Sequence, residues 1–265
     1  MQKIDLTVND MHKPEILLAE DDFFLAYKPP KMHSAPQRSS GSLRTFFDFC
    51  AEQFPETAQI PGRKTGEGGL LHRLDFDTNG ILLFARTRAG MEFFLDQQKN
   101  GKIKKSYCAL VLKSETTLPG FPKQQHQLVV DVETQNFPSF EKPFPLQSAF
   151  KAYGPGRKAV RPTSDGVQYV TEFCGSSRLT DSGISALHLE ITRGFRHQIR
   201  CHLAWLGMPI LNDNLYGGSV FGSGFLALRA YSLSFPDITS GRLRSFEIHP
   251  LKLENLTLDR CVKKV

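Results

Sequence analysis

The stretch from Leu70 to Thr87, LLHRLDFDTNGILLFART, constrains the fold of this chain more than any other. An uninterrupted apolar run over residues 81–85 follows directly after Asn79-Gly80, which predicts a buried strand that begins at a turn. The short polar segment before the turn contains four ionisable side chains, His72, Arg73, Asp75 and Asp77. The sequence therefore places a carboxylate and a guanidinium where a turn meets the core.

Asp75 has three interpretations at this position. An aspartate in a turn commonly caps its own backbone, which is a structural role. The spacing Asp75-x-Asp77-x-Asn79-Gly80 also matches the first half of an EF-hand calcium loop, but position twelve is Arg86 instead of glutamate. The third interpretation is a reactive carboxylate, which an arginine would keep ionised and oriented.

Composition excludes several classes of protein. The 265 residues can form one large domain or two small ones, and 40% hydrophobic with 23% charged residues is ordinary for a soluble protein. No apolar run approaches the 18 residues of a membrane span, and the N-terminus lacks the apolar core of a secretory signal. The five cysteines form no C-x-x-C pair, so we expect a cytoplasmic protein with no metal, no cofactor and no membrane partner.

The basic charge permits binding to nucleic acid. The net charge is +6 and the pI is about 9.1. Basic residues cluster at 99–105, 157–161 and 193–200, although solvated surfaces often carry such clusters. His197 and His202 in the last region lie five residues apart, so they do not share a helical face as a metal pair would. We interpret them as polar or RNA-facing groups.

Periodicity predicts more strands than helices. Two short strands are expected within 16–28, and Pro29-Pro30 ends the second of them after Lys28. Further strands are expected at 81–86, 106–112, 185–192 and 226–235. We interpret Lys28 as structural. The expected helices cover 43–54 with Ser42 as N-cap, 88–100 between Thr87 and Gly101, and 197–207. This pattern indicates an α+β protein with a mixed, largely antiparallel sheet.

Several blocks of the sequence resemble those of one enzyme family. The opening stretch is similar to the HRLDxxTSGLLLFA signature of the RluA-type pseudouridine synthases. Four further blocks occur in that family's order across about residues 16–236: EDDFFLAYKPPKMHSAP, KKSYCALV, GFRHQIRCHLAWLGMPILNDNLYGG and LRAYSLSF. The resemblance implies the α+β catalytic fold of that family, with a sheet split by a central active-site cleft.

The resemblance also implies roles for individual residues. Asp75 matches the catalytic aspartate, Tyr107 the tyrosine that stacks on the target base, and Arg200 the arginine that pairs with the aspartate. Leu228 matches an apolar wall of the pocket, and Arg73 an arginine that fills the gap left by the extruded nucleotide. We add His72, Arg193, Arg196 and His197 as expected contacts to RNA.

Five positions depart from the family pattern. Asn79 replaces a serine, Asn212 a glycine, Arg229 a histidine, and Phe195-Arg196 the commoner Arg-Thr. None of them alters Asp75, Tyr107 or Arg200. Asn212 still suits a left-handed backbone, which asparagine tolerates.

The sequence thus predicts a monomeric protein with a single catalytic domain over 1–265 and no separate N-terminal RNA-binding domain. A variable insertion is expected at 114–165, where seven prolines lie. The expected activity is isomerisation of uridines to pseudouridine in ribosomal or transfer RNA. The alternative is an RNA-binding or RNA-chaperone protein that keeps the fold without the chemistry.

Overall fold

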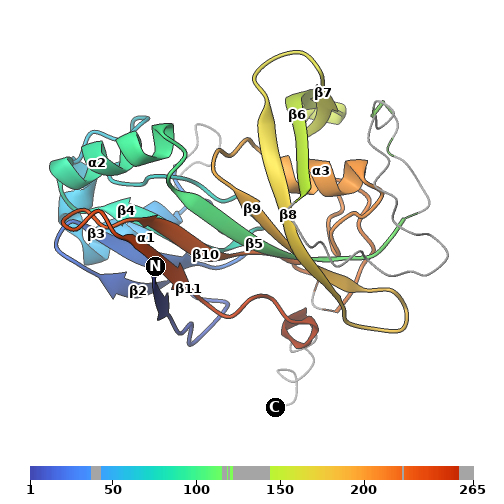
Figure 1. Cartoon of the computed structure of the whole chain (residues 1–265), viewed down its shortest axis with the longest axis horizontal. Helices are drawn as coiled ribbons and strands as arrows, with labels where there is room; N and C mark the ends of the chain where they lie inside the picture. The colour runs from blue at the N-terminus through green and yellow to red at the C-terminus, as the bar shows by residue number, and fades with distance from the viewer. Residues whose placement is uncertain (37–42, 115–117, 119, 122–143, 223, 257–265) are drawn as a thin grey trace. The chain divides into compact units, whose positions relative to one another are not determined.

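The computed structural model describes residues 1–36, 43–114, 118, 120–121, 144–222 and 224–256 (Figure 1). The chain forms two compact units. The first unit comprises Met1–Lys105 and Ala230–His249, and the second comprises Ser106–Arg229 with the segment from Pro250. Of the helices within these ranges, none has both the length and the apolar character that crossing a bilayer requires.

The first unit contains a twisted sheet with helices on both faces. Its strands are β1 (Gln2–Asp5), β2 (Glu15–Ala19), β3 (Phe23–Lys28), β4 (Asn79–Ala85), β10 (Leu228–Pro236) and β11 (Leu243–Glu247). They follow the order β2-β3-β4-β10, with β11 on β10 and β1 on β11. The pairing of β1 with β11 is parallel, whereas β2–β3, β3–β4 and β10–β11 are antiparallel.

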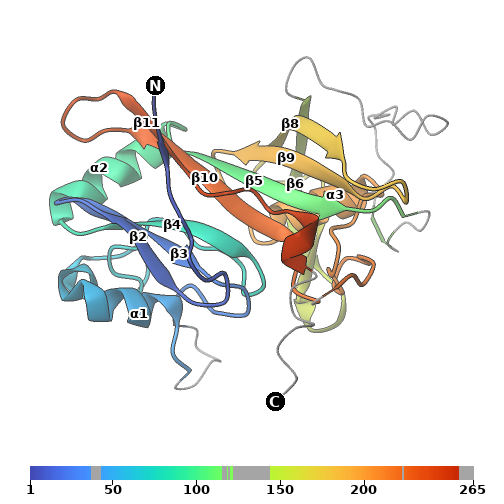
Figure 2. The ribbon, with the colours of Figure 1, turned by 90° about the horizontal axis from the view of Figure 1, so that it is seen from below.

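Two helices cover this sheet from opposite faces, α1 (Phe46–Gln53) and α2 (Arg88–Lys99) (Figure 2). Successive side chains of a strand point to opposite faces, and β3 is buried along its whole length. The Phe23 ring contacts Phe94 of α2 edge-on, with the ring centroids 5.7 Å apart. The neighbouring Phe24 stacks on Phe84 at 4.8 Å, and Phe84 in turn contacts Phe46 of α1. A strand covered on both faces explains why its sequence is apolar without alternation.

The start of α1 differs from the prediction. The helix begins at Phe46 with Thr45 as N-cap, three residues later than Ser42 would place it. The Thr45 hydroxyl accepts from the Asp48 N–H at 3.3 Å, and the Asp48 carboxylate accepts from the Thr45 N–H at 2.7 Å. This reciprocal capping box satisfies two backbone donors at once, which a lone serine does not. Ser42 itself lies outside the described residues.

The start and end of α2 match the prediction. Thr87 is the N-cap and accepts from the Gly90 N–H at 2.9 Å. Gly101 follows the helix with φ +68°, and the Lys102 N–H donates to the Gln97 carbonyl at 2.9 Å. The left-handed glycine and the backward hydrogen bond close the helix as expected.

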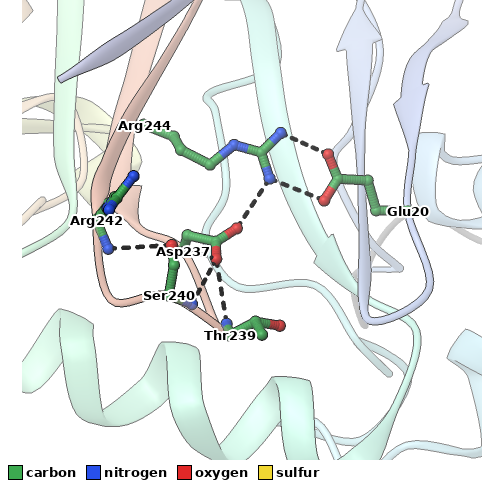
Figure 3. Close-up of polar contacts among 6 residues, drawn as sticks. All are labelled: Glu20, Asp237, Thr239, Ser240, Arg242 and Arg244. Atoms are coloured by element: carbon green, nitrogen blue, oxygen red, sulfur yellow. Dashed lines mark hydrogen bonds and ion pairs between the residues drawn. The ribbon is translucent and has the colours of Figure 1, made fainter.

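A network of charged side chains joins two turns of the first unit (Figure 3). The Arg244 guanidinium of β11 donates to both carboxylate oxygens of Glu20, in the β2–β3 turn, at 2.9 and 2.6 Å. It also donates to Asp237, at the start of the β10–β11 turn, at 3.0 Å. Asp237 accepts from the Ser240 N–H at 2.8 Å, so one arginine holds both hairpins.

The second unit has strands β5 (Lys104–Val111), β6 (Phe144–Tyr153), β7 (Ala159–Thr163), β8 (Tyr169–Arg178) and β9 (Ser185–Ile191), in the order β5-β9-β8-β6-β7. The pairings β6–β7, β6–β8 and β8–β9 are antiparallel. Its helix, α3 (Gln198–Trp205), packs against β7 and β8. Short 3₁₀ turns lie at Pro55–Gln59 in the first unit, and at Pro155–Arg157 and Leu253–Leu256 in the second.

The α+β class with a mixed, largely antiparallel sheet is confirmed. The strands expected near 16–28, 81–86, 106–112, 185–192 and 226–235 are all present as β2–β3, β4, β5, β9 and β10. The expected insertion at 114–165 contains the regular hairpin β6–β7, and residues 122–143 of it lie outside the described residues. The single domain and its active-site cleft stay predictions.

Candidate active site

Asp75 lies in the loop of residues 72–78, here named the Asp75 loop, directly before β4. Its side chain is half-buried. The Thr78 N–H donates to the Asp75 carbonyl at 3.1 Å and closes a four-residue turn. After the turn Gly80 adopts φ +135°, and a Cβ there would meet the Ala230 carbonyl oxygen at 2.2 Å. Glycine therefore allows β4 to approach the backbone of β10 closely, which sets where the loop ends.

A second loop, residues 29–34, holds the Asp75 loop in place. The Ser34 hydroxyl donates to the Leu74 carbonyl at 2.7 Å and accepts from the Leu74 N–H at 3.0 Å. The Met32 N–H donates to the Phe76 carbonyl at 3.2 Å. These contacts fix the backbone on both sides of Asp75.

The Lys28 side chain connects the two loops through hydrogen bonds. Its side chain is fully buried, and the ammonium group donates to the carbonyls of Pro29 at 2.9 Å, Met32 at 2.7 Å and Phe76 at 3.2 Å. Burial lowers the pKa of Lys28 to about 7, and attraction to Asp75 and Asp77 opposes this shift. The structural interpretation of Lys28 is confirmed, and its contacts show that it positions the Asp75 loop.

The two other predicted residues of this loop differ in burial. The Leu83 N–H donates to Nε2 of His72 at 3.4 Å, while Nδ1 is buried and has no hydrogen-bond partner among the described residues. Desolvation, with help from Lys105 and Arg63, lowers the pKa of His72 well below its usual value, so the ring is neutral. Arg73 is exposed, and its guanidinium lies 3.3 Å from the Glu67 carboxylate.

In the second unit, Arg200 on α3 forms a buried ion pair with Asp213. Its Nε and Nη2 donate to the two carboxylate oxygens at 2.7 and 2.8 Å, and both side chains are at least 93% buried. The fork-to-fork geometry fixes the plane of the guanidinium. Asp213 also accepts from the Leu215 N–H at 3.2 Å. We name α3 together with residues 210–218 the Arg200 region.

Tyr216 supports this ion pair from the side. The Arg200 guanidinium carbon lies 5.3 Å from the centre of the Tyr216 ring, a cation–π distance. The Tyr216 hydroxyl accepts from the Val160 N–H at 2.8 Å and lies 3.3 Å from Nδ1 of His197. Desolvation, with Arg200 and Arg196, lowers the pKa of His197 to about 3, so this ring is neutral. His197 also serves as the N-cap of α3 with φ +56°.

Asn212 confirms the expectation of a left-handed backbone, with φ +64°. Its side chain does more than the family's glycine could. The amide donates to the carbonyls of Phe221 at 2.8 Å and Phe225 at 2.9 Å and accepts from the Phe221 N–H at 2.6 Å. Asparagine therefore fixes the backbone next to Asp213.

For His202 the structure selects the first of the two expected alternatives, a polar contact. Its side chain is fully buried and does not face solvent. Its ring lies 2.9 Å from the hydroxyls of both Ser148 and Thr171, on β6 and β8. These bonds attach α3 to the sheet.

The remaining predicted residues of the second unit lie at its surface or in its strands. Arg193 is exposed, and its guanidinium carbon lies 5.1 Å from the Tyr169 ring centre. Arg196 is exposed and donates to the carbonyls of Arg157 at 3.0 Å and Ala159 at 3.2 Å. Tyr107 on β5 and Leu228 at the start of β10 are 6% and 3% exposed.

The structure thus assembles two groups of predicted residues. His72, Arg73 and Asp75 share the Asp75 loop of the first unit, whereas Arg200 and His197 share the Arg200 region of the second. The ion pair between Asp75 and Arg200 stays a prediction. Within the described residues, no group of three or more His, Cys, Asp or Glu side chains could hold a metal ion.

Sequence reasoning assigned no role in the site to Asp213 or Tyr216, and it did not foresee that Lys28 positions the loop. Each of these residues lies in one of the blocks that carried the resemblance, PILNDNLYGG or AYKPP. A polar residue inside such a block was the available signal.

Comparison with known proteins identifies the family of this chain. The family model described as RNA pseudouridylate synthase matches residues 22–205, which include the Asp75 loop and Arg200. An uncharacterized RNA pseudouridine synthase of Bacillus subtilis, YjbO, is 31% identical over 244 residues, which are 91% of this chain and 70% of that protein. The ribosomal large subunit pseudouridine synthase D of Xylella fastidiosa is 26% identical over 78% of this chain and 52% of its own length.

Two solved human structures share the fold. This chain aligns with RNA Pseudouridylate Synthase Domain Containing 4 with a TM-score of 0.57 at 17% identity, over 93% of this chain and 92% of that one. The alignment with Domain Containing 1 has a TM-score of 0.56 at 19% identity, over 89% and 84%. With the extent of the family match, these findings confirm the resemblance: the chain belongs to the RNA pseudouridylate synthase family, a family of isomerases.

Proposed function

We propose that this chain converts uridines of structured RNA to pseudouridine, with Asp75 as the catalytic carboxylate. The observation that carries the proposal is the Asp75 loop, which lies within the family match and holds a half-exposed carboxylate on a backbone fixed by Lys28, Met32 and Ser34. A group that must act on a ribose needs both a fixed position and access to its substrate.

The reaction exchanges one bond for another without net oxidation. The bond between N1 of uracil and C1′ of ribose breaks, the base turns, and C5 bonds to C1′. N1 gains a proton and C5 loses one. Asp75 assists cleavage either by attack on the sugar or by removal of a ribose proton to give a glycal. Both routes require the ionised carboxylate, and a protonated Lys28 nearby favours that form.

The other predicted residues have roles that suit their side-chain chemistry. Tyr107 would stack on the uracil while the glycosidic bond is open, and Leu228 would form the apolar wall of the pocket. Arg200 would orient Asp75, since Asp213 holds its guanidinium plane and uses two of its five N–H donors. Arg73 would occupy the gap left by the extruded nucleotide, and His72 would line the pocket.

RNA contact outside the pocket would fall to basic side chains at the surface. Arg193 and Arg196 are the proposed contacts to phosphates, so RNA affinity should decrease with salt. His197, whose ring is neutral, is proposed to contact RNA as a hydrogen-bonding group. The name of the Xylella relative refers to the large ribosomal subunit, which favours ribosomal RNA, and transfer RNA is the second possibility. We expect the reaction to take place in the cytoplasm on a monomeric enzyme.

The test compares Asp75→Asn with Asp77→Asn. Both changes remove one carboxylate from the same loop, so Asp77→Asn controls for charge and folding. Each protein is incubated with unmodified total RNA, and pseudouridines are mapped by carbodiimide-dependent primer stops. We expect the wild type and Asp77→Asn to modify the same sites and Asp75→Asn to modify none, while its RNA affinity stays within about twofold of wild type.

Two results would overturn the proposal. Pseudouridine made by purified Asp75→Asn would show that another group carries the chemistry. RNA binding by the wild type without any pseudouridine would support the alternative of an RNA-binding or chaperone protein on the same fold.

A further inference from the structure

We propose that the rings of Phe76 and His33 form a stacking platform for the nucleobase that neighbours the target uridine. This inference rests on the proposed function and deepens it, because it assigns a site for an unpaired base beside the catalytic carboxylate. We refer to the two rings as the Phe76 platform.

Phe76 is unusually open for its residue type. It is 41% exposed, and among the described residues no other phenylalanine falls in the exposed class. Full burial of such a side chain stabilises a fold by about 1.5–3 kcal/mol, much of which this position forgoes. The next residue in the chain from Asp75 therefore presents an aromatic surface to the solvent.

The hydrogen bonds of residue 76 do not require a ring. Those that tie it to Lys28 and to the 29–34 loop use its carbonyl oxygen, which accepts from Lys28 Nζ and the Met32 N–H, both at 3.2 Å. Any residue except proline could occupy that backbone position equally well. The aromatic side chain is thus left for a contact outside the chain.

The ring is nevertheless held in place. The imidazole of His33 lies against it with centroids 4.6 Å apart and an angle of 46° between the planes. His33 follows Met32 and precedes Ser34, and both of these residues are hydrogen-bonded to the Asp75 loop. A ring held by a rigid neighbour loses little conformational entropy when a second flat group stacks on it.

A nucleobase fits this surface better than a protein partner does. One half-exposed ring is far smaller than the roughly 800 Å² that a stable protein interface buries on each side. The neighbouring exposed side chains are Lys31 and Arg73, which suit phosphates. Extrusion of a uridine also takes a stacking partner away from the adjacent base, and an aromatic ring beside Asp75 can replace it.

The first test measures binding to single strands. The probes are a fluorescein-labelled twelve-nucleotide oligouridine and an oligomer of the same length with abasic riboses. The test variant, Phe76→Leu, keeps an apolar side chain of similar size without the π-face. The controls are Phe76→Tyr, which keeps the ring, and Leu43→Ala, which removes another exposed apolar side chain from the same unit. We expect Phe76→Leu to weaken oligouridine binding about fivefold or more, in line with the stacking of one base. Phe76→Tyr and Leu43→Ala should stay within about twofold, and the abasic oligomer should show no difference between the proteins.

The second test uses RNA that contains a uridine mapped with the wild-type protein. Phe76→Leu should raise KM by about tenfold and leave kcat within about threefold, because the platform holds a neighbouring base and not the reacting one. A matched decrease in kcat would show that the ring instead holds Asp75, and unchanged binding of both RNAs would also overturn the platform. If the wild type makes no pseudouridine while Phe76→Leu still binds oligouridine weakly, the proposed function fails and the platform remains an RNA contact.

Discussion

The Asp75 loop and the Arg200 region hold their charged side chains in opposite ways. In the Asp75 loop the cation, Lys28, is fully buried and binds backbone carbonyls, whereas the carboxylate of Asp75 stays half-buried. In the Arg200 region the cation and its carboxylate, Asp213, are buried together as a bidentate pair.

The difference suits the roles proposed for the two charges. Hydrogen bonds from Lys28, Met32 and Ser34 hold the backbone of the Asp75 loop, and the proposed catalytic carboxylate is only half-buried. A guanidinium that only orients another group can be paired and enclosed, since two parallel hydrogen bonds define its plane. Under the proposed function, the Asp75 loop supplies the reactive group and the Arg200 region supplies the rigid one.

Removing the carboxylate of the Arg200 region should have the largest effect. Asp213→Ala removes the bidentate partner of the buried Arg200 guanidinium, and breaking a buried ion pair in this way typically costs about 3–5 kcal/mol of unfolding free energy. Urea denaturation checks this value. Asp181→Ala, an exposed aspartate of the same unit, should stay within about 0.5 kcal/mol of wild type.

A double variant sharpens this prediction. Replacing both partners, Arg200→Met with Asp213→Leu, should recover most of the lost stability, because no charge remains buried. It should not recover pseudouridine formation if Arg200 orients Asp75. A stable double variant with full activity would contradict the rigid role of the Arg200 region.

Removing the buried cation of the Asp75 loop should have a smaller effect. Lys28→Met keeps the apolar stem but leaves three carbonyls without the ammonium donor, and one hydrogen bond to a charged group is worth about 1.5–3 kcal/mol. We expect that loss in urea denaturation, with faster hydrogen exchange at the Met32 and Thr78 amides. Lys64→Met, at an exposed site of the same unit, is the control. Unchanged exchange at both amides would show that Lys28 does not fix the loop.

The smallest of these effects concerns a neutral group buried in α3. Desolvation lowers the pKa of His202 to about 3, against a usual value near 6.5. At a pH between these two values, His202 therefore binds a proton in the unfolded chain but not in the folded one. Stability should therefore fall as the pH decreases below 6.5, and His202 alone should account for about 1.4 kcal/mol between pH 7.5 and 5.5.

The measurement is urea denaturation at the two pH values. His202→Gln keeps hydrogen-bonding capacity without a titrating group, so it should lose less stability than wild type on acidification. His12→Gln changes an exposed histidine of the first unit and should leave the acid dependence unchanged. Equal acid dependence in His202→Gln and wild type would contradict the assignment.

Much of the local structure could be predicted because its signals act over a few residues. Thr87 and Gly101 defined both ends of α2, and Asn212 adopted the left-handed backbone expected of it. The apolar run after Gly80 became β4. The start of α1 was misjudged because serine at 42 and threonine at 45 both qualify as caps, and only Asp48 selects between them.

The sequence by itself determined the places of β2–β5, β9 and β10 and of the three helices, the turn that presents Asp75, and the family to which the chain belongs. It gave no bounds for β1, β6–β8 and β11. Only the tertiary structure decided which partner each buried charge has. Arg200 meets Asp213 across 13 residues, and Lys28 meets the Phe76 carbonyl across 48. Turn and capping preferences act between neighbours along the chain, whereas the partner of a buried charge depends on which groups folding brings within about 3 Å.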